Sequence, residues 1–286
     1  MSDQPPRWTD QQILESRPPK HPTDPGRPYA FLVEPELAAT GRVEDVATIF
    51  LTNHECPYRC LMCDLWRNTT DAPVPPGAIP AQIDVALGQL PPAQHVKLYN
   101  SGNFFDRQAI PPEDYTAIAD RVRMFRTVTV ENHPRFCRSE CPRFRDLLGT
   151  DLAVGIGLET AHREILDRLN KRMTLEDFER AVGFLRHHAI GVRAFVLLRP
   201  PFMEEQEGVE WAVRSIEYAF SVGVQCCSVI PTRTGNGALE RLHTAGLFDL
   251  PTLSSMETVL EAGILMDRGR VFMDLWDIER FYECGR

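Results

Sequence analysis

Three cysteines stand close together in the segment TNHECPYRCLMCDLWRN, which covers residues 52–68. Cys56, Cys60 and Cys63 have the spacing C-x3-C-x2-C, so one short loop carries all three thiols. Thiolates are ligands for zinc and for iron–sulfur clusters. The spacing therefore predicts a metal centre on this loop.

The number of cysteines bears on the kind of metal centre. A structural zinc site usually takes four protein ligands in pairs, and His54 would have to be the fourth here. A cubane [4Fe–4S] cluster normally takes four thiolates, so three cysteines would leave one iron free to bind a substrate or cofactor. We favour the cluster, because a zinc knuckle does not explain the strands and helices that follow the loop. The zinc site is the alternative.

The elements that must position this loop alternate in type along the chain. Short apolar segments predict six buried strands, and a further strand is a candidate at 270–276; the six cover residues 46–51, 95–100, 127–132, 152–159, 191–198 and 226–230. Segments with apolar residues at helical spacing predict helices between them, at 79–90, 111–125, 139–149, 174–188, 204–223 and about 254–267.

Strands this apolar are covered on both faces, which indicates a parallel sheet with helices outside. Right-handed crossovers curl such a sheet into a barrel or part of one. The predicted fold is therefore α/β, a partial or full TIM-like barrel in residues 46–286 that ends in a helical segment. Residues 1–45 are rich in proline and polar residues, so we expect an N-terminal extension that is largely irregular.

Polar and glycine residues follow the predicted strands at the ends where such barrels carry their chemistry. The cysteine loop follows the first strand, and the sequence NSGN follows the second. Glu131 and Glu159 end the third and fourth strands, and Arg199 follows the fifth. The loop PTRTGNG, which contains Arg233, follows the sixth. We therefore expect a site at this end of the sheet.

The C-x3-C-x2-C loop after the first strand resembles the signature of the radical S-adenosylmethionine (SAM) superfamily. The segments YNSGNFFD, GIGLET, LNKRMTLEDFERA and LLRPPFMEEQEGVEWAVRSIEYA are similar to the subgroup that contains the elongator-type and archaeosine-synthesis radical enzymes. The resemblance covers residues 46–230. It implies a partial (β/α)6 barrel in which Cys56, Cys60 and Cys63 bind three irons, while the amino and carboxylate groups of SAM chelate the fourth.

The resemblance also implies contacts to SAM. Met62 stands where the family usually has an aromatic residue near the adenine, and it can make a similar apolar contact. Ser101, Gly102 and Asn103 stand where the family often has Gly-Gly-Glu, which contacts the methionine amine. They would otherwise form an ordinary turn.

Other charged residues at the strand ends are candidates for the same site. Glu159 would bind a ribose hydroxyl, and Glu131 would contact SAM or the substrate. Arg199 and Arg233 would bind the SAM carboxylate or an acidic substrate. The alternative for each is a charge at the surface. TGNG (residues 234–237) resembles a glycine-rich anion loop, but a short GxG pattern is weak, so we interpret it as a flexible turn.

The remaining cysteines and one histidine have less specific patterns. A second cluster would have to use Cys137, Cys141, Cys226, Cys227 or Cys284, but these lie in three regions without a tight motif. We therefore interpret them as ordinary thiols. We interpret His133 as a loop residue, with an acid–base role as the alternative.

The composition of the chain argues against some classes of function. The net charge of −9 disfavours a stand-alone nucleic-acid binder, because such a chain repels polyanions on average. No run of about eighteen apolar residues appears, and the N-terminus has no apolar signal region. Clustered thiols in a chain of this kind indicate the reducing cytoplasm.

The sequence therefore predicts a cytoplasmic radical SAM enzyme with a [4Fe–4S] cluster, acting on a small-molecule or natural-product precursor. The resemblance implies an external electron donor such as flavodoxin or ferredoxin. One alternative is the radical modification of a nucleoside in RNA. Another is a binding module stabilised by zinc, without catalysis.

Overall fold

The structure is a computed structural model, and it describes residues 7–282. Its strands form one sheet in the order β1 to β8, in which β1 is antiparallel to β2 and all later neighbours are parallel. The strands are β1 (Ala30–Leu37), β2 (Val43–Phe50), β3 (His95–Tyr99), β4 (Thr127–Asn132), β5 (Asp151–Glu159), β6 (Gly191–Leu198), β7 (Cys226–Pro231) and β8 (Arg270–Met273). The six predicted strands and the candidate seventh are therefore all present, as β2 to β8.

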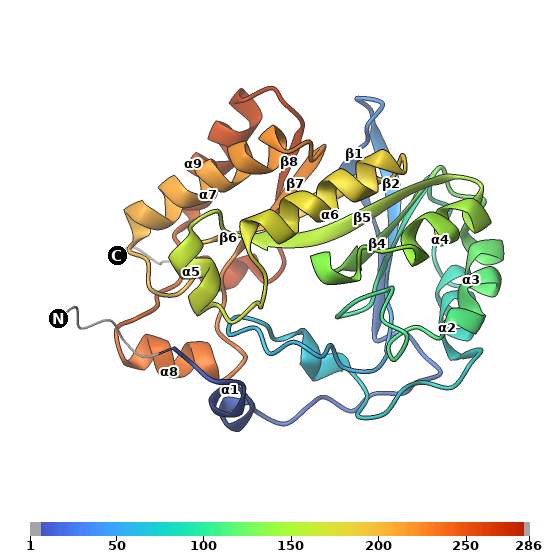
Figure 1. Cartoon of the computed structure of the whole chain (residues 1–286), viewed down its shortest axis with the longest axis horizontal. Helices are drawn as coiled ribbons and strands as arrows, with labels where there is room; N and C mark the ends of the chain where they lie inside the picture. The colour runs from blue at the N-terminus through green and yellow to red at the C-terminus, as the bar shows by residue number, and fades with distance from the viewer. Residues whose placement is uncertain (1–6, 283–286) are drawn as a thin grey trace.

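The sheet is curled, with its helices on the outer face (Figure 1). Glu36 on β1 contacts both Lys97 on β3 and Arg193 on β6, which a flat sheet would hold far apart. Arg270 on β8 donates to the Leu37 carbonyl of β1 at 3.0 Å, so the two edges approach each other. Within residues 7–282, β1 and β8 are the two edges of the sheet and do not pair with each other, so the sheet is a partial barrel of the predicted α/β class.

The predicted helices are also present. They are α2 (Ala78–Leu87), α3 (Tyr115–Val122), α4 (Glu140–Leu148), α6 (Leu175–His187), α7 (Glu205–Ser221) and α9 (Leu253–Leu265). Thr174 begins α6 with a capping box, because its hydroxyl accepts the Asp177 amide and the Asp177 carboxylate accepts the Thr174 amide. The outer faces of the strands and the apolar stripes of these helices form one main core.

The N-terminal extension is more regular than the sequence predicted. It contains α1 (Asp10–Ser16) and β1, while β2 begins at Val43, three residues before the expected start. Pro35 lies inside β1, and an edge strand tolerates proline because its outer N–H positions need no partner. Two short helices were also not predicted, α5 (Arg163–Arg168) and α8 (Ala238–Thr244). In residues 7–282, no helix is both long enough and apolar enough to span a bilayer.

Candidate active site

The cysteine loop lies at the carboxyl end of β2, inside the open end of the curled sheet. Cys56, Cys60 and Cys63 are half-buried and form no disulfide. Burial raises the pKa of all three thiols, that of Cys60 to about 12. Such thiols stay protonated unless a metal displaces their protons. Within residues 7–282, no three His, Cys, Asp or Glu side chains are grouped closely enough to hold a single metal ion.

The backbone of this loop is held by two distant segments. The Leu61 amide donates to the Leu169 carbonyl at 2.9 Å, and Asn170 Nδ2 donates to the Arg59 carbonyl at 2.7 Å. From the other side, buried Asn236 donates to the Leu61 carbonyl at 2.7 Å. Because the loop lacks regular structure, these bonds fix its course and so the places of the thiols. From the sequence we interpret the TGNG segment as a flexible turn, but in the structure its Asn236 holds the cysteine loop.

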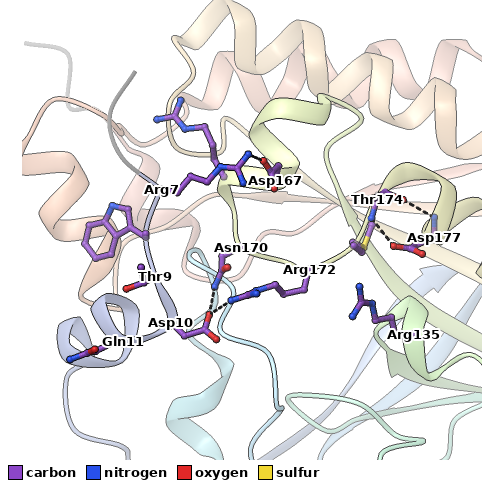
Figure 2. A pocket seen from close by; sticks show the side chains of 13 residues that line it. Arg7, Thr9, Asp10, Gln11, Arg135, Asp167, Asn170, Arg172, Thr174 and Asp177 are labelled. Carbon is purple, nitrogen blue, oxygen red and sulfur yellow. Dashed lines mark hydrogen bonds and ion pairs between the residues drawn. The ribbon is translucent and has the colours of Figure 1, made fainter. Parts of the chain in front are cut away.

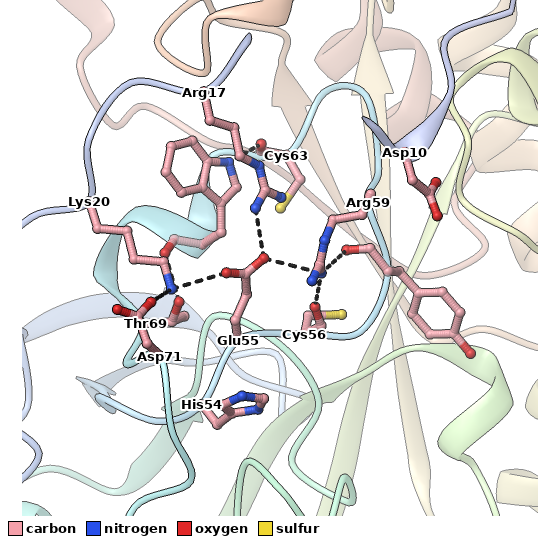
Figure 3. A network of polar contacts seen from close by, with 12 residues as sticks. Asp10, Arg17, Lys20, His54, Glu55, Cys56, Arg59, Cys63, Thr69 and Asp71 are labelled. Atoms are coloured by element: carbon pink, nitrogen blue, oxygen red, sulfur yellow. Dashed lines mark hydrogen bonds and ion pairs between the residues drawn. The ribbon is translucent and has the colours of Figure 1, made fainter. Parts of the chain in front are cut away.

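The N-terminal extension holds the loop through Glu55 (Figure 3). Its carboxylate accepts Arg17 at 2.7 Å, Lys20 at 3.0 Å and Arg59 at 3.1 Å. Burial opposes the charge of Glu55, but hydrogen bonds from Arg17 and Lys20 outweigh it and lower the pKa. The Arg17 guanidinium also lies 4.4 Å from the centre of the Trp66 ring. These contacts therefore attach the N-terminal extension to the cysteine loop.

The Ser101-Gly102-Asn103 segment lies directly against the first cysteine. Asn103 Nδ2 lies 3.2 Å from the sulfur of Cys56, and its Oδ1 accepts the His133 amide at 2.7 Å. The Ser101 hydroxyl lies 2.9 Å from the Tyr29 hydroxyl. Ser101 has a φ of 53°, which turns the chain sharply after β3. The structure thus brings this segment and the cysteine loop together, while its contact to SAM stays a prediction.

Glu131 supports the same segment from β4. Its Oε1 accepts the Asn100 amide at 2.7 Å, and the Ser101 and Gly102 amides also bond to its carboxylate. Burial raises the pKa of Glu131 to about 7 against these bonds. The carboxylate therefore holds the segment after β3. Any contact of Glu131 to SAM or the substrate stays a prediction.

Glu159 is paired with a residue that the sequence analysis did not single out. Its Oε1 lies 2.5 Å from Lys171 Nζ, and both residues are 7% exposed. Burial opposes the Lys171 charge, but Glu159 and the thiols of Cys60 and Cys56 raise the pKa of its ammonium. The pair therefore lies beside two of the three candidate ligands. Glu159 has a φ of 64° at a bulge in β5, which turns its side chain inward.

His133 is a positioning residue in this structure. Its Nδ1 accepts the Arg135 amide at 3.2 Å, and its Nε2 lies 3.0 Å from the Lys171 carbonyl. Burial and the Lys171 charge lower the pKa of His133 to about 3, so the ring is neutral. The ring stacks on Tyr58 of the cysteine loop at 4.1 Å between centroids. These contacts agree with its interpretation as a loop residue.

The two predicted arginines have partners of their own. Arg199 forms an ion pair with Glu205 at 2.6 Å, and it donates to the Leu250 carbonyl at 2.5 Å. Arg233 pairs with Asp274 at 2.8 Å. Their contacts to Leu250 and Asp274 tie the ends of β6 and β7 to the C-terminal part of the chain. A role in binding SAM stays a prediction for Arg199.

Met62 and the other cysteines lie among apolar residues. Met62 is half-buried and packs against two small clusters that include Leu61 and Leu169. The cysteines outside the loop that the structure describes are buried, at positions 137, 141, 226 and 227. Cys284 lies outside the described residues.

Comparisons with known proteins were made by sequence and by structure, and no family model matches the chain. The chain is 24% identical over 254 residues to an uncharacterised protein of Methanocaldococcus jannaschii, covering 83% of this chain and 70% of that protein. It is 28% identical over 214 residues to the archaeosine synthase subunit beta of Methanosarcina acetivorans. That match covers 70% of this chain and 60% of the subunit.

A solved structure shares the fold. The coproporphyrinogen III oxidase HemN of Escherichia coli, described as a radical SAM enzyme, aligns with a TM-score of 0.51 and 12% identity. The alignment covers 91% of this chain and 56% of HemN. The expected resemblance is thus confirmed: this chain has the curled-barrel fold of the radical SAM enzymes and is similar in sequence to the subgroup that includes an archaeosine synthase subunit.

Proposed function

We propose that this protein is a radical SAM enzyme in which Cys56, Cys60 and Cys63 hold a [4Fe–4S] cluster. The observation that carries the proposal is the set of three thiols, free of disulfides, on one loop that distant segments hold in place, in the fold of the radical SAM enzymes. Three thiolates and one open iron position suit a cluster that binds SAM. When bound and reduced by an external donor, the cluster would supply the electron that cleaves SAM to methionine and a 5′-deoxyadenosyl radical, and this radical would take a hydrogen atom from the substrate.

The residues of the chain orient the cofactor in this proposal. Asn103 bonds to the sulfur of Cys56, which favours the thiolate form of that ligand. Ser101, Gly102 and Asn103 offer polar groups to the methionine amine, and Met62 offers an apolar contact to the adenine. Glu159 keeps its Oε2 for a ribose hydroxyl, while its Oε1 bonds to Lys171.

Aromatic residues on the inner face of the sheet would exclude water from the reacting centre. Phe50, Tyr99 and Phe195 are half-buried, and the Tyr99 ring lies 6.2 Å from Phe50 and 6.1 Å from Phe195. The first two end β2 and β3, next to the cysteine loop and Ser101. An apolar wall beside the site protects a radical from side reactions with solvent.

The substrate in this proposal is a small molecule or natural-product precursor. The net charge of −9 supports it against a polyanionic substrate. The second candidate is a nucleoside in RNA, supported by the sequence similarity to an archaeosine synthase subunit. Binding of RNA that weakens steeply with salt would favour the second candidate. The unpaired thiols support a reducing compartment such as the cytoplasm. The proposed chemistry needs an external electron, for which we propose a flavodoxin or ferredoxin.

The test is the triple variant Cys56→Ala/Cys60→Ala/Cys63→Ala, prepared without oxygen beside the wild type. The wild type should contain about four irons and cleave SAM with dithionite, while the variant should contain no iron and form no 5′-deoxyadenosine. The variant should keep its circular dichroism spectrum, because the loop lies outside the main core.

The matched control is Cys137→Ala/Cys141→Ala, which should keep the iron and the cleavage. A triple variant that still makes 5′-deoxyadenosine would refute the ligand assignment. A colourless wild type with zinc bound in the loop would instead support the binding module.

A further inference from the structure

Lys171 lies between two residues with a left-handed backbone. Asn170 has a φ of 55° and Arg172 a φ of 61°, which residues other than glycine rarely adopt. Both of these side chains bond to Asp10, at 2.7 Å and 2.9 Å, in the open pocket that Figure 2 shows. Lys171 is only 7% exposed instead, and its ammonium bonds to Glu159. Backbone strain of this kind is typical of functional sites, so the buried place of this one charge needs a functional explanation.

The backbone on either side of this charge is bonded to the surroundings of the thiols. The Leu169 carbonyl accepts the amide of Leu61, the residue directly after Cys60, at 2.9 Å. The Lys171 carbonyl lies 3.0 Å from Nε2 of His133, whose ring stacks on the cysteine loop. These bonds hold the Lys171 ammonium at a fixed place relative to the thiols.

The ammonium end of the buried ion pair acts on the thiols more strongly than the carboxylate end. Burial raises the pKa of the Cys60 thiol to about 12, and the Lys171 charge is the main influence that lowers it. The Glu159 charge opposes Lys171 there, but more weakly. Burial also raises the pKa of Cys56, and Lys171 is the strongest charge that acts on that thiol. The pair is neutral as a whole, yet it presents its positive side to two candidate ligands.

We propose that Lys171 raises the reduction potential of the cluster that Cys56 and Cys60 help to hold. The inference rests on the proposed function, and it concerns the electron that the cluster gains rather than the binding of SAM. Reduction by an external one-electron donor adds one negative charge to the cluster, and no bond forms or breaks in that step. A cation in a buried place is poorly screened by water, so it stabilises the added charge and makes the cluster easier to reduce.

The experiment measures the midpoint potential of the anaerobically reconstituted full-length protein without SAM, by electron paramagnetic resonance during a titration with dithionite. At a fixed solution potential, Lys171→Met should lower the ratio of reduced to oxidised cluster at least about tenfold, which is 59 mV for a one-electron step. Glu159→Gln should change the ratio in the opposite direction, because it leaves the ammonium without its counter-charge. A residue with a purely structural role would not give shifts of opposite sign.

Two further variants are matched controls. Lys171→Arg keeps the charge, so its potential should stay closer to that of wild type than the potential of Lys171→Met. Arg172→Gln removes one positive charge at the next residue, where the side chain is 53% exposed and paired with Asp10. Water screens that charge, so the midpoint potential should equal that of wild type.

The outcomes that overturn the proposal are distinct. Equal potentials for wild type and Lys171→Met overturn it, even if SAM binding weakens, because Lys171 would then be a ligand of SAM alone. Shifts of the same sign in Lys171→Met and Glu159→Gln also overturn it, because they would indicate a general distortion of the site. If Lys171→Met holds too little cluster to titrate, a Glu159→Gln potential that does not rise overturns the proposal. A wild type that holds no cluster contradicts the proposed function instead.

Discussion

At the scale of single residues, one glycine creates the room for the buried ion pair at the site. A Cβ atom at Gly157 would clash with Glu159 Oε1 and would lie 2.5 Å from Lys171 Nζ. Both charges are buried, so neither can move into water at low cost. The position of Lys171 beside the cysteines therefore depends on a residue without a side chain in β5, the strand that also carries Glu159.

Replacing this glycine tests that dependence. Gly157→Ala should lower the free energy of unfolding by about 1–3 kcal/mol, because the ion pair must shift to admit the methyl group. The measurement is urea unfolding of the metal-free protein. The control is Gly183→Ala on the exposed side of α6, where no atom lies within 4 Å, and alanine should stabilise that helix by about 0.5–1 kcal/mol. Equal effects of the two changes would contradict the interpretation.

The raised pKa of Glu131 has a consequence for stability. Its pKa is about 7 in the folded protein and 4.5 in the reference state. Between pH 4.5 and 7 the folded state therefore binds more protons than the unfolded state, so this group lowers stability as the pH rises. The stabilisation that comes from the protonated form of Glu131 is fully present below pH 4.5 and is lost above pH 7.

Glu131→Gln should remove this part of the pH dependence. At pH 8 the variant should be more stable than wild type by at most about 3 kcal/mol, because a shift of one pKa unit corresponds to about 1.36 kcal/mol. This difference in stability should vanish near pH 4.5. Unfolding by urea at several pH values measures the difference between the two proteins. A variant with the same pH slope as wild type would show that the carboxylate keeps its ordinary pKa.

At the scale of elements, the cysteine loop has little structure of its own and is fixed by its neighbours. The segment after α5, the loop before α8 and the N-terminal extension each bond to it. Ile13 of α1 also packs with Leu61 of the loop and with the apolar side of α8. Three separate attachments give the thiols fixed places, which a cluster with a defined shape requires.

A substitution at Asn236 tests these attachments most directly. Asn236→Ala removes a buried donor from the Leu61 carbonyl and an acceptor from the Leu239 amide, at a cost of about 1–3 kcal/mol. The reconstituted variant should lose its iron to a chelator faster than wild type. The control Asn68→Ala removes only the exposed contact to His21 and should release iron at the wild-type rate. Equal release from all three proteins would show that Asn236 does not hold the loop.

At the scale of the whole molecule, a buried charge cluster helps to close the curled sheet. Glu36 of the antiparallel edge strand pairs with Lys97 on β3 and Arg193 on β6, and the three side chains are 7–12% exposed. Burial raises the pKa of Glu36, but the charges of Arg193 and Lys97 outweigh burial and lower it. The stabilisation from Glu36 is therefore present at neutral pH and is lost as the pH falls through its lowered pKa.

Glu36→Leu should lower the free energy of unfolding by about 3–5 kcal/mol, because it leaves the buried Arg193 without its carboxylate and leaves Lys97 only the more exposed Glu34, at 3.6 Å. The triple variant Glu36→Leu/Lys97→Leu/Arg193→Met should recover most of this loss. Urea unfolding at pH 7 measures both proteins. A single variant as stable as wild type would show that the cluster does not hold β1 against the sheet.

Much of this architecture could be predicted because the signals are local. The strands β2 to β7 begin and end within a few residues of the predicted positions, since each is a short apolar run between helices. β1 was missed because Pro35 interrupts its pattern, and α5 and α8 because six or seven residues are too few for a clear helical period. The Thr9–Gln12 capping box was a signal for α1 that could have been used.

The sequence by itself determined the three thiols, their spacing and their place after a buried strand, because ligands on one loop are set by the local order of residues. The tertiary structure alone decided which side chains surround them. Asn236 and Leu61 are 175 residues apart, and Lys171 reaches the cysteines only where a bulge in β5 and a glycine make room for it. Contacts between distant segments depend on how the sheet curls and packs, and no local pattern encodes that.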